Sequence, residues 1–370
     1  MVDLKGQYLK IKNEIDRGIQ SVINDTAFIN GPAVKEFKSD LEIFLKVKHV
    51  IPCANGTDAL QIAMMALDLK PGDEVITASF TYIATAEVIG LLGLTPVLVE
   101  VDENTFCIDP KEIEKAITPR TKAIVPVHLY GQCANMEAIM EIAKKHHLHV
   151  IEDVAQALGA EYTLASGEKV RAGTIGTIGC TSFFPSKNLG CYGDGGAIFT
   201  NDDGLAEKCK MIAHHGQRIQ YVHDVLGVNS RLDTIQAAVL KVKLKLLDQY
   251  AEARRKAADF YDAAFCNHPK IQIPKRNPSS THVFHQYTLR LKNTDRNKTR
   301  EELAKRGIPS MIYYPIPVHL QKAFVSRNYK KGDFDLTEAL CDSVLSLPMH
   351  TELETGTLQF ITNTVNELLQ

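Results

Sequence analysis

Short apolar runs alternate with helical patterns between about residues 50 and 210 of the chain. The runs are nearly continuous in apolar residues, which is typical of strands buried on both faces of a parallel sheet. Between them, apolar residues recur at the spacing of one helix face. The predicted strands cover 74–77, 95–101, 123–129, 149–151, 174–184 and 196–200, and the predicted helices cover 58–69, 81–92, 110–117 and 136–146. This alternation predicts an α/β fold with a mainly parallel central sheet flanked by helices.

The pattern changes in the C-terminal third of the chain. One apolar helix face extends over 233–265, which predicts a single long helix with Lys241, Lys243 and Lys245 on a solvated side. A connector rich in Pro, Ser and Asn follows at 267–281. Beyond it we predict a strand at 286–291 and helices at 300–307 and 336–345. These elements indicate a smaller α+β domain at the C-terminus.

Composition and charge exclude several classes of protein. The 370 residues include 42 basic and 44 acidic side chains, a net charge of −2, which argues against a polycationic nucleic-acid binder. The chain has no apolar run of membrane-spanning length, and its polar start predicts no secretory signal. The eight cysteines form no CxxC pair and are expected to be reduced. We therefore expect a cytoplasmic protein with a large domain at 1–245 and a small one at 246–370.

The first candidate for chemistry is the segment CANGTDAL at 53–60. A loop with a glycine leads directly into a helix, whose free N–H groups and positive dipole end suit a phosphate group. Thr57 adds a hydroxyl donor. An ordinary N-cap by Asn55, Thr57 or Asp58 explains the same residues equally well. The segment lacks the GxxxxGK[ST] spacing, which argues against a nucleotide-triphosphate loop.

The second candidate is VIEDVAQ at 150–156, where an acid follows a buried apolar strand. Asp153 would lie at the sheet edge where ligands bind, and it suits a cationic ring nitrogen, a metal or a cap of the next helix. A metal would require more ligands, and His146, His147 and His149 lack a useful spacing. Gln156 follows Asp153 by about one helical turn and would face the same ligand.

The third candidate is CTSFFPSKNLG at 180–190, followed by YGDGGA at 192–197. Lys187 lies between aromatic residues and glycines, where desolvation would lower its pKa and free the amine for Schiff-base chemistry. The glycines would let a bulky cofactor approach the main chain. Taken alone, a surface lysine in a glycine-rich turn explains the segment better.

Together, a phosphate cradle, an acid for a pyridinium and a lysine for an imine are what pyridoxal 5′-phosphate (PLP) requires. In these three segments the chain resembles the DegT/DnrJ/StrS nucleotide-sugar aminotransferases, which are aspartate-aminotransferase-like enzymes of fold type I. The likeness extends from Asp3 to the segment that starts at Ser346. Its motifs are NGTDAL, PGDEVI, FTYIATAEVI, EDVAQ, SFFPSKNLG, GDGGAIFTND, GVNSRLDTIQAA and YYPIP.

The resemblance implies a role for each matching residue around the cofactor ring. Lys187 would bind PLP covalently and then carry a proton between cofactor and substrate carbons. Asp153 would pair with the protonated pyridine nitrogen, which keeps the ring an electron sink. Gln156 would bind the ring hydroxyl, and Tyr82 would stack on the ring face.

The resemblance also implies a phosphate site and a homodimer. The residues that would hold the phosphate are Gly56, Thr57, Asp58 (through its main chain) and Ser182. Asn229 would reach the phosphate of the neighbouring subunit's cofactor, so the two subunits would share their active sites.

Substrate contacts are expected at Arg231, Tyr313, Tyr314 and His319. Arg231 is a fixed cation that suits a carboxylate or a diphosphate, and an ion pair with Asp233 is the structural alternative. The two tyrosines suit a uracil or a sugar ring, although core packing also explains them. Relatives often have His in place of Tyr313, a departure that concerns sugar recognition.

The expected function is a PLP-dependent aminotransferase with glutamate as amino donor. The likeness is greatest to aminotransferases that make UDP-2-acetamido-3-amino-2,3-dideoxyglucuronate, which implies a UDP-linked 3-keto-2-acetamido uronic acid as acceptor. The product would serve bacterial surface polysaccharides such as the lipopolysaccharide O-antigen. The alternatives are a 4-keto-6-deoxy acceptor and a non-catalytic sensor on the same fold. Relatives that deoxygenate sugars replace the imine lysine with His, so Lys187 argues against that activity.

Overall fold

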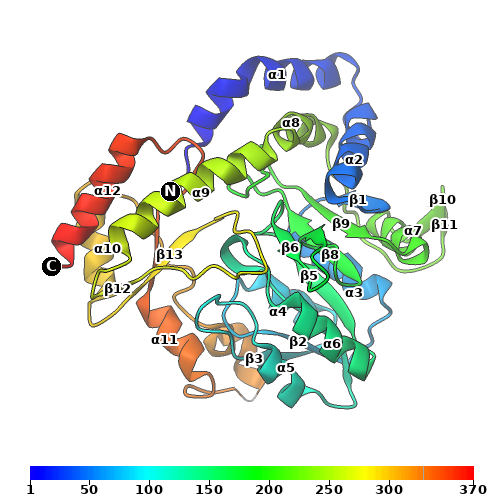
Figure 1. The fold of residues 1–370 in the computed structure, drawn as a ribbon. Helices are drawn as coiled ribbons and strands as arrows, with labels where there is room; N and C mark the ends of the chain where they lie inside the picture. The colour runs from blue at the N-terminus through cyan, green and yellow to red at the C-terminus, as the bar shows by residue number, and fades with distance from the viewer. Residues whose placement is uncertain (328) are drawn as a thin grey trace.

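The computed structural model describes residues 1–327 and 329–370, and a seven-stranded sheet lies at its centre (Figure 1). The strand order is β1-β9-β8-β5-β4-β2-β3. The strands are β1 His49–Cys53, β2 Glu74–Ala78, β3 Thr95–Val99, β4 Thr121–Val125, β5 His149–Asp153, β8 Ile178–Ser182 and β9 Gly196–Thr200. β9 runs antiparallel to both of its neighbours, whereas β3, β2, β4, β5 and β8 are parallel. The predicted mainly parallel sheet is confirmed.

Helices cover both faces of this sheet because successive strand residues point to opposite sides. In β5, Val150 packs into one apolar cluster and Ile151 into another. The first cluster includes residues of α2, α5, α6 and α8, and the second includes residues of α3, α4 and α7. The bounds are α2 Pro32–Leu45, α3 Gly56–Ala66, α4 Ala84–Leu91, α5 Pro110–Ala116, α6 Met136–His146, α7 Asp203–Ala213 and α8 Thr234–Leu244.

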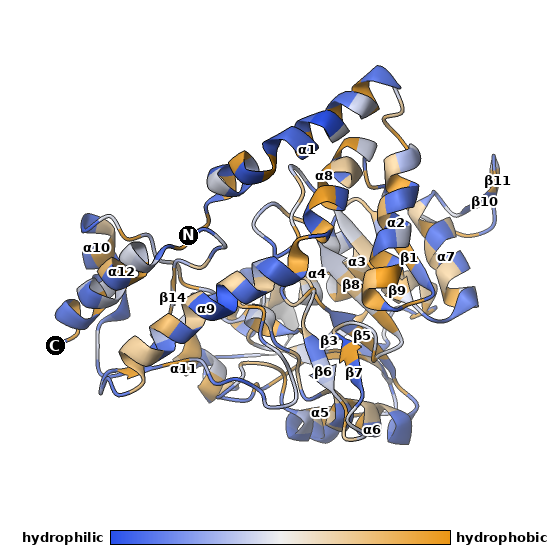
Figure 2. Cartoon of the chain, turned by 45° about the horizontal axis from the view of Figure 1, so that its top comes forward, coloured by the Kyte–Doolittle hydropathy of each residue, from blue (hydrophilic) through white to orange (hydrophobic). Residues whose placement is uncertain are grey.

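The C-terminal part has its own sheet and apolar cluster, as the sequence predicts. Its antiparallel strands are β12 Ile271–Gln272, β13 Tyr287–Leu291 and β14 Val344–Leu347, and its helices are α10 Arg296–Lys305, α11 Asp335–Ser343 and α12 Thr355–Leu368. The helix α9 (Leu247–Phe265) connects the two parts (Figure 2). Its Leu247 packs in the core of the large sheet, whereas its Tyr261 packs in the C-terminal cluster. The division at residue 245 stays a prediction.

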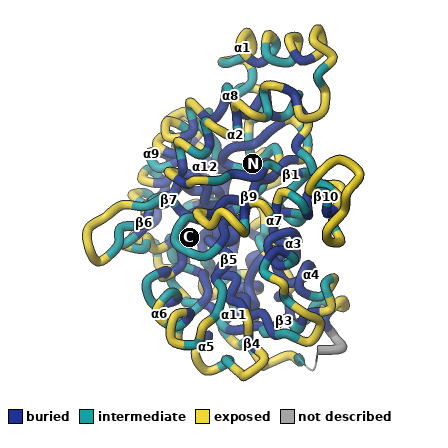
Figure 3. The backbone as a smooth tube through the Cα atoms, turned by 90° about the vertical axis from the view of Figure 1, so that its right-hand side faces the viewer, coloured by how far each residue is buried: buried dark blue, intermediate teal, exposed yellow. Residues whose placement is uncertain are grey.

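The remaining elements lie at the periphery or in connections. They are the helix α1 Leu4–Asn24, the hairpins β6 Glu161–Thr163 with β7 Lys169–Arg171 and β10 Gln217–Ile219 with β11 Val222–His223, and the 3-10 turns η1 Leu129–Gly131, η2 Val318–Leu320 and η3 Lys322–Arg327. Figure 3 shows the central strands buried and the β10–β11 hairpin exposed. Nowhere in the described part of the chain does a helix have the length and apolarity needed to cross a bilayer.

The predicted single helix over 233–265 is wrong, because the chain forms α8 and α9 with a break at Lys245 and Leu246. At the break, Leu246 N–H donates to the carbonyl of Lys243 at 3.0 Å, a bond of the tighter 3-10 type. The break lets α8 pack against α1 and α2 while α9 continues toward the C-terminal part.

Candidate active site

A cavity of about 830 Å³ opens at the carboxyl ends of the central strands. The segments that follow β1, β2, β5 and β8 line it, together with the loop before α11. The predicted residues that it brings together are Gly56, Thr57, Asp58, Tyr82, Asp153, Gln156, Ser182, Lys187, Tyr313 and Tyr314. Residues distant in sequence therefore converge where parallel strands end, as expected for this type of sheet.

The N-terminus of α3 forms one wall of the cavity. Asn55 caps the helix, because its Oδ1 accepts from the Asp58 N–H at 2.8 Å. Within the described residues, the N–H groups of Gly56 and Thr57 have no hydrogen-bond partner. A Cβ on Gly56 would lie 2.7 Å from the Cβ of Ser182, so only glycine allows this close approach. The wall thus combines an ordinary cap with free donors for an anion.

Lys187 lies on a tightly held loop after β8. Burial lowers the pKa of Lys187 to about 8, and the charge of Asp153 opposes part of that shift. The loop is closed by hydrogen bonds from Cys191 N–H to the Phe183 carbonyl at 2.8 Å and from Asn188 Nδ2 to the Val283 carbonyl at 3.0 Å. Lys187 therefore has far more neutral amine near physiological pH than an ordinary lysine, which favours imine chemistry.

A second buried lysine supports this loop from α8. Lys243 is only 2% exposed, and its Nζ donates to the Gly190 carbonyl at 2.8 Å. It also lies 4.7 Å from the ring centroid of Tyr192, a cation–π contact. The prediction that Lys243 lies on a solvated face is therefore wrong. Its aliphatic stem packs inward, and its Nζ contacts a carbonyl and a ring, while burial lowers its pKa to about 8.

Gln156 is oriented by groups on two sides. Its Oε1 accepts from the Tyr130 N–H at 2.8 Å, which directs Nε2 toward the Tyr314 hydroxyl at 2.9 Å. The second N–H of Nε2 is left for a group in the cavity. Burial raises the pKa of Tyr314, so its hydroxyl stays protonated. Tyr314 is therefore a neighbour of Gln156, and its ring lies near the ring of Tyr82 at 6.1 Å.

Asn229, Arg231 and His319 do not line this cavity in the single chain. Asn229 is exposed, and Arg231 lines a separate cavity of about 810 Å³ with several cationic side chains. These cations are Lys35, Lys38, Lys210 and Arg218. His319 is buried, and its Nε2 lies 3.0 Å from Glu338 Oε1. Their predicted contacts with cofactor or substrate stay predictions.

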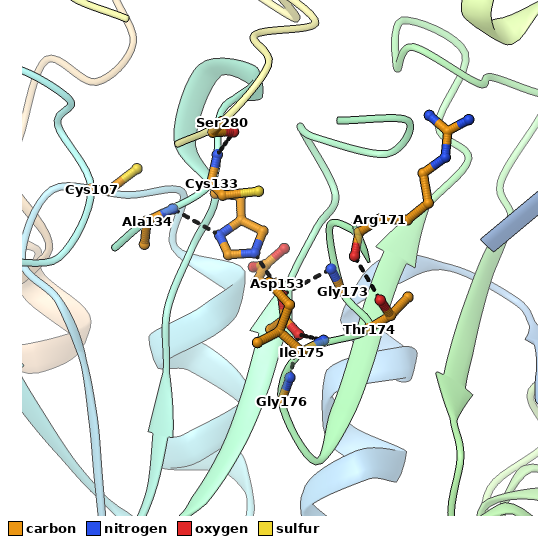
Figure 4. Close-up of polar contacts among 12 residues, drawn as sticks. Cys107, Cys133, Ala134, Asp153, Arg171, Gly173, Thr174, Ile175, Gly176 and Ser280 are labelled. Carbon is orange, nitrogen blue, oxygen red and sulfur yellow. Dashed lines mark hydrogen bonds and ion pairs between the residues drawn. The ribbon is translucent and has the colours of Figure 1, made fainter. Parts of the chain in front are cut away.

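The buried pair of His128 and Glu152 is not predicted from the sequence. Both side chains are 0% exposed, and His128 Nε2 lies 2.9 Å from Glu152 Oε2. His128 Nδ1 accepts from the Ala134 N–H at 3.2 Å, which assigns the proton to Nε2 (Figure 4). Glu152 also accepts from three main-chain N–H groups, those of Gly173, Ile175 and Gly176, at 2.6–2.8 Å (Figure 4). The sequence signal was Glu152 itself, an acid inside an apolar strand.

Comparison with known proteins identifies the family. A model of the DegT/DnrJ/EryC1/StrS aminotransferase family matches residues 9–366. The chain belongs to this family. The predicted resemblance is therefore confirmed, and the fold is that of the type I aminotransferases.

Individual relatives match along nearly the whole chain. The pleiotropic regulatory protein of Geobacillus stearothermophilus is 48% identical, covering 99% of this chain and 97% of that protein. The UDP-2-acetamido-2-deoxy-3-oxo-D-glucuronate aminotransferase of Pseudomonas aeruginosa is also 48% identical, with 97% of each chain covered. The crystal structure of S. venezuelae DesV in complex with a ketimine intermediate is 39% identical, with a TM-score of 0.95 and coverage of 100% and 98%.

We predict that Glu152→Gln destabilises the protein. A glutamine amide keeps one accepting oxygen and presents N–H groups to the other donors, and losing two hydrogen bonds to a charged group, at about 1.5–3 kcal/mol each, costs about 3–6 kcal/mol. For a chain of this length, that loss corresponds to a fall in Tm of about 5 °C. Calorimetry of Glu152→Gln checks it, with the exposed Glu168→Gln as control. Equal melting temperatures would show that the network contributes little.

We also predict that Lys187 reacts with acetic anhydride with a half-maximal rate near pH 8, because only the neutral amine is a nucleophile. Exposed lysines should follow the ordinary lysine pKa of about 10.4. Peptide mass spectrometry of protein freed of bound small molecules and labelled between pH 6.5 and 10.5 measures both. If Lys187 labels in parallel with the exposed lysines, its amine is not desolvated.

Proposed function

We propose that this protein is a PLP-dependent aminotransferase that moves an amino group from glutamate to a keto-sugar nucleotide. The observation that carries the proposal is the convergence of free helix N–H groups, an acid and a lysine with a lowered pKa in one cavity. These groups match the phosphate, the ring nitrogen and the aldehyde of PLP. Family membership supports the same reaction.

The residues fit the cofactor at each of its polar groups. The unpartnered N–H groups of Gly56 and Thr57 and the hydroxyls of Thr57 and Ser182 would hold the phosphate, since these hydroxyls donate to no group within the described residues. The main-chain N–H of Asp58, also expected there, already donates to Asn55 Oδ1. Asp153 would face the ring nitrogen, and Gln156 Nε2 would donate to the ring hydroxyl. Tyr82, 57% exposed, would cover the ring face.

PLP, when bound, supplies a conjugated ring that accepts the electrons of a deprotonated substrate carbon. Lys187 would bind the cofactor covalently and then hold the proton that moves between cofactor and substrate. Its desolvated amine suits both tasks, because it loses its proton near neutral pH. Asp153 would accept a hydrogen bond from the ring nitrogen and favour its protonated form. The structure of the loop around Lys187 fixes the amine in the cavity.

The preferred acceptor is a UDP-linked 3-keto-2-acetamido uronic acid, which is what the name of the Pseudomonas relative describes. Arg231 would hold its negative charge from the neighbouring subunit, since in the single chain it lines a separate cavity. Tyr313 and Tyr314 would contact the sugar or uracil from the loop that lines the first cavity. His319 would act only through this loop, because it is buried. We propose that the protein is cytoplasmic and that its product serves the synthesis of bacterial surface polysaccharides.

A homodimer with shared sites belongs to the proposal. Asn229 and the hairpin β10–β11 are exposed, and the hairpin carries apolar Ile219, Tyr221 and Val222 in solvent. Phe184, which lines the cavity, is 52% exposed. A second copy that covers these side chains would bring its own Asn229 and Arg231 to the cavity.

The experiment that tests the function follows the cofactor spectrum. Purified protein loaded with PLP should absorb near the visible, glutamate should bleach this band, and a UDP-linked 3-keto uronic acid should restore it. Lys187→Ala should lose the covalently bound band and turnover. A restored band only with 4-keto-6-deoxy sugar nucleotides would move the acceptor to that class. A band that glutamate leaves unchanged would favour a non-catalytic sensor on this fold; the Geobacillus relative is named a pleiotropic regulatory protein.

The shared site is tested by mixing two inactive variants, Lys187→Ala and Asn229→Ala. Each heterodimer would contain one site free of both lesions if Asn229 acts across the interface. Equal mixing with free exchange should restore activity to about a quarter of the wild-type level. Native mass spectrometry confirms the exchange. No recovery in a mixture that contains heterodimers would place Asn229 in its own subunit's site.

A further inference from the structure

The carboxylate of Asp153 is held by two donors inside the protein. The hydroxyl of Thr85 donates to Asp153 Oδ2 at 2.8 Å, and the N–H of Ala155 donates to Oδ1 at 3.1 Å. Thr85 is 1% exposed and Asp153 is 7% exposed. A carboxylate only accepts, so the hydroxyl proton of Thr85 is committed to Asp153.

We propose that Thr85 is a positioning residue for Asp153: its hydroxyl orients the carboxylate toward the place that the ring nitrogen would take. This inference rests on the proposed function. A hydrogen bond to the charged form favours that form, and each oxygen retains a lone pair for a further donor. Thr85 does not line the cavity, so it acts through Asp153 and does not touch the cofactor.

The position of Thr85 in the fold explains why it can fulfil this role. It lies in the first turn of α4, which packs against the central sheet through Val88 and Ile89. Its hydroxyl direction is set by the hydrogen bond to Asp153 Oδ2. Tyr82, three residues earlier, lines the cavity. One short segment therefore supplies both a residue that would cover the ring face and the support of the acid that would face the ring nitrogen.

The charged groups around Asp153 determine in which direction the cofactor pKa should shift when Thr85 is replaced. The ionisable groups that face it are Lys187, Tyr314 and Cys180, and burial raises the pKa of Tyr314 and Cys180 so that both are neutral. Lys187 and the ring nitrogen are then the cationic groups with which Asp153 would interact. A protonated ring repels a proton on the nitrogen that links Lys187 to the cofactor, which lowers the pKa of that link. Loss of the Thr85 hydroxyl would weaken protonation of the ring nitrogen. The pKa of the nitrogen that links Lys187 to the cofactor would then rise.

The experiment compares Thr85→Val with Thr85→Ser in the PLP-loaded protein. The absorbance of the bound cofactor is titrated with pH, and cofactor affinity is measured by dialysis. We expect Thr85→Val to raise the pKa of the link by about one unit and to weaken PLP binding about tenfold, whereas Thr85→Ser stays near wild type. Asp153→Asn, which removes the acid's charge, should shift the pKa further in the same direction.

Two controls separate positioning from packing. Thr77 is also buried, and its hydroxyl donates to the Val125 carbonyl at 2.9 Å outside the cavity, so Thr77→Val should lower Tm but leave the pKa unchanged. Thr85→Ala replaces Thr85→Val if the latter does not fold. A wild-type protein without a bound-PLP band would overturn the proposed function. The inference about Thr85 alone would be overturned by a different result. In that case the cofactor band of Asp153→Asn titrates with another pKa than wild type, but those of Thr85→Val and Thr85→Ala titrate like wild type.

Discussion

The buried carboxylate of Glu152 is the constraint on which the active site depends. Its two oxygens accept four hydrogen bonds, from His128 and from three N–H groups of 173–176. Through these bonds the loop 173–176, the end of β5 and the segment after β4 are held together. The loop from His128 leads to Tyr130, whose N–H orients Gln156. A charge in the core is tolerated because every lone pair of the carboxylate is satisfied.

The two neighbouring acids on β5 point to opposite faces of the sheet, because strand side chains alternate between the two faces. Glu152 points to the core side and is saturated by donors, whereas Asp153 points to the cavity. The main chain of Asp153 is fixed on both sides, by its N–H to the Pro126 carbonyl and by its carbonyl to the His128 N–H, each at 3.0 Å. The saturated acid thus supplies rigidity, and the adjacent acid remains available.

Because buried strands leave a local apolar signal, the sequence predicted six of the seven central strands, although it missed β1. The three candidate segments that it singled out line one cavity, and their roles stay predictions. The sequence failed where partners are distant. Lys243 and Thr85 have no local signal: the first donates to a loop more than 50 residues earlier, and the second to an acid 68 residues later. The break between α8 and α9 also depends on tertiary packing, since the apolar helix face continues through it.

The number of bonds to each carboxylate explains why chemistry is expected at Asp153 and not at Glu152. Glu152 has no acceptor capacity left, so a further cation would have to displace a main-chain donor. Asp153 accepts two donors and keeps two lone pairs, one on each oxygen. A ring nitrogen can therefore bind without breaking an existing bond. Preorganised charge of this kind needs no reorganisation when the reaction begins, which is the main source of electrostatic stabilisation in enzymes.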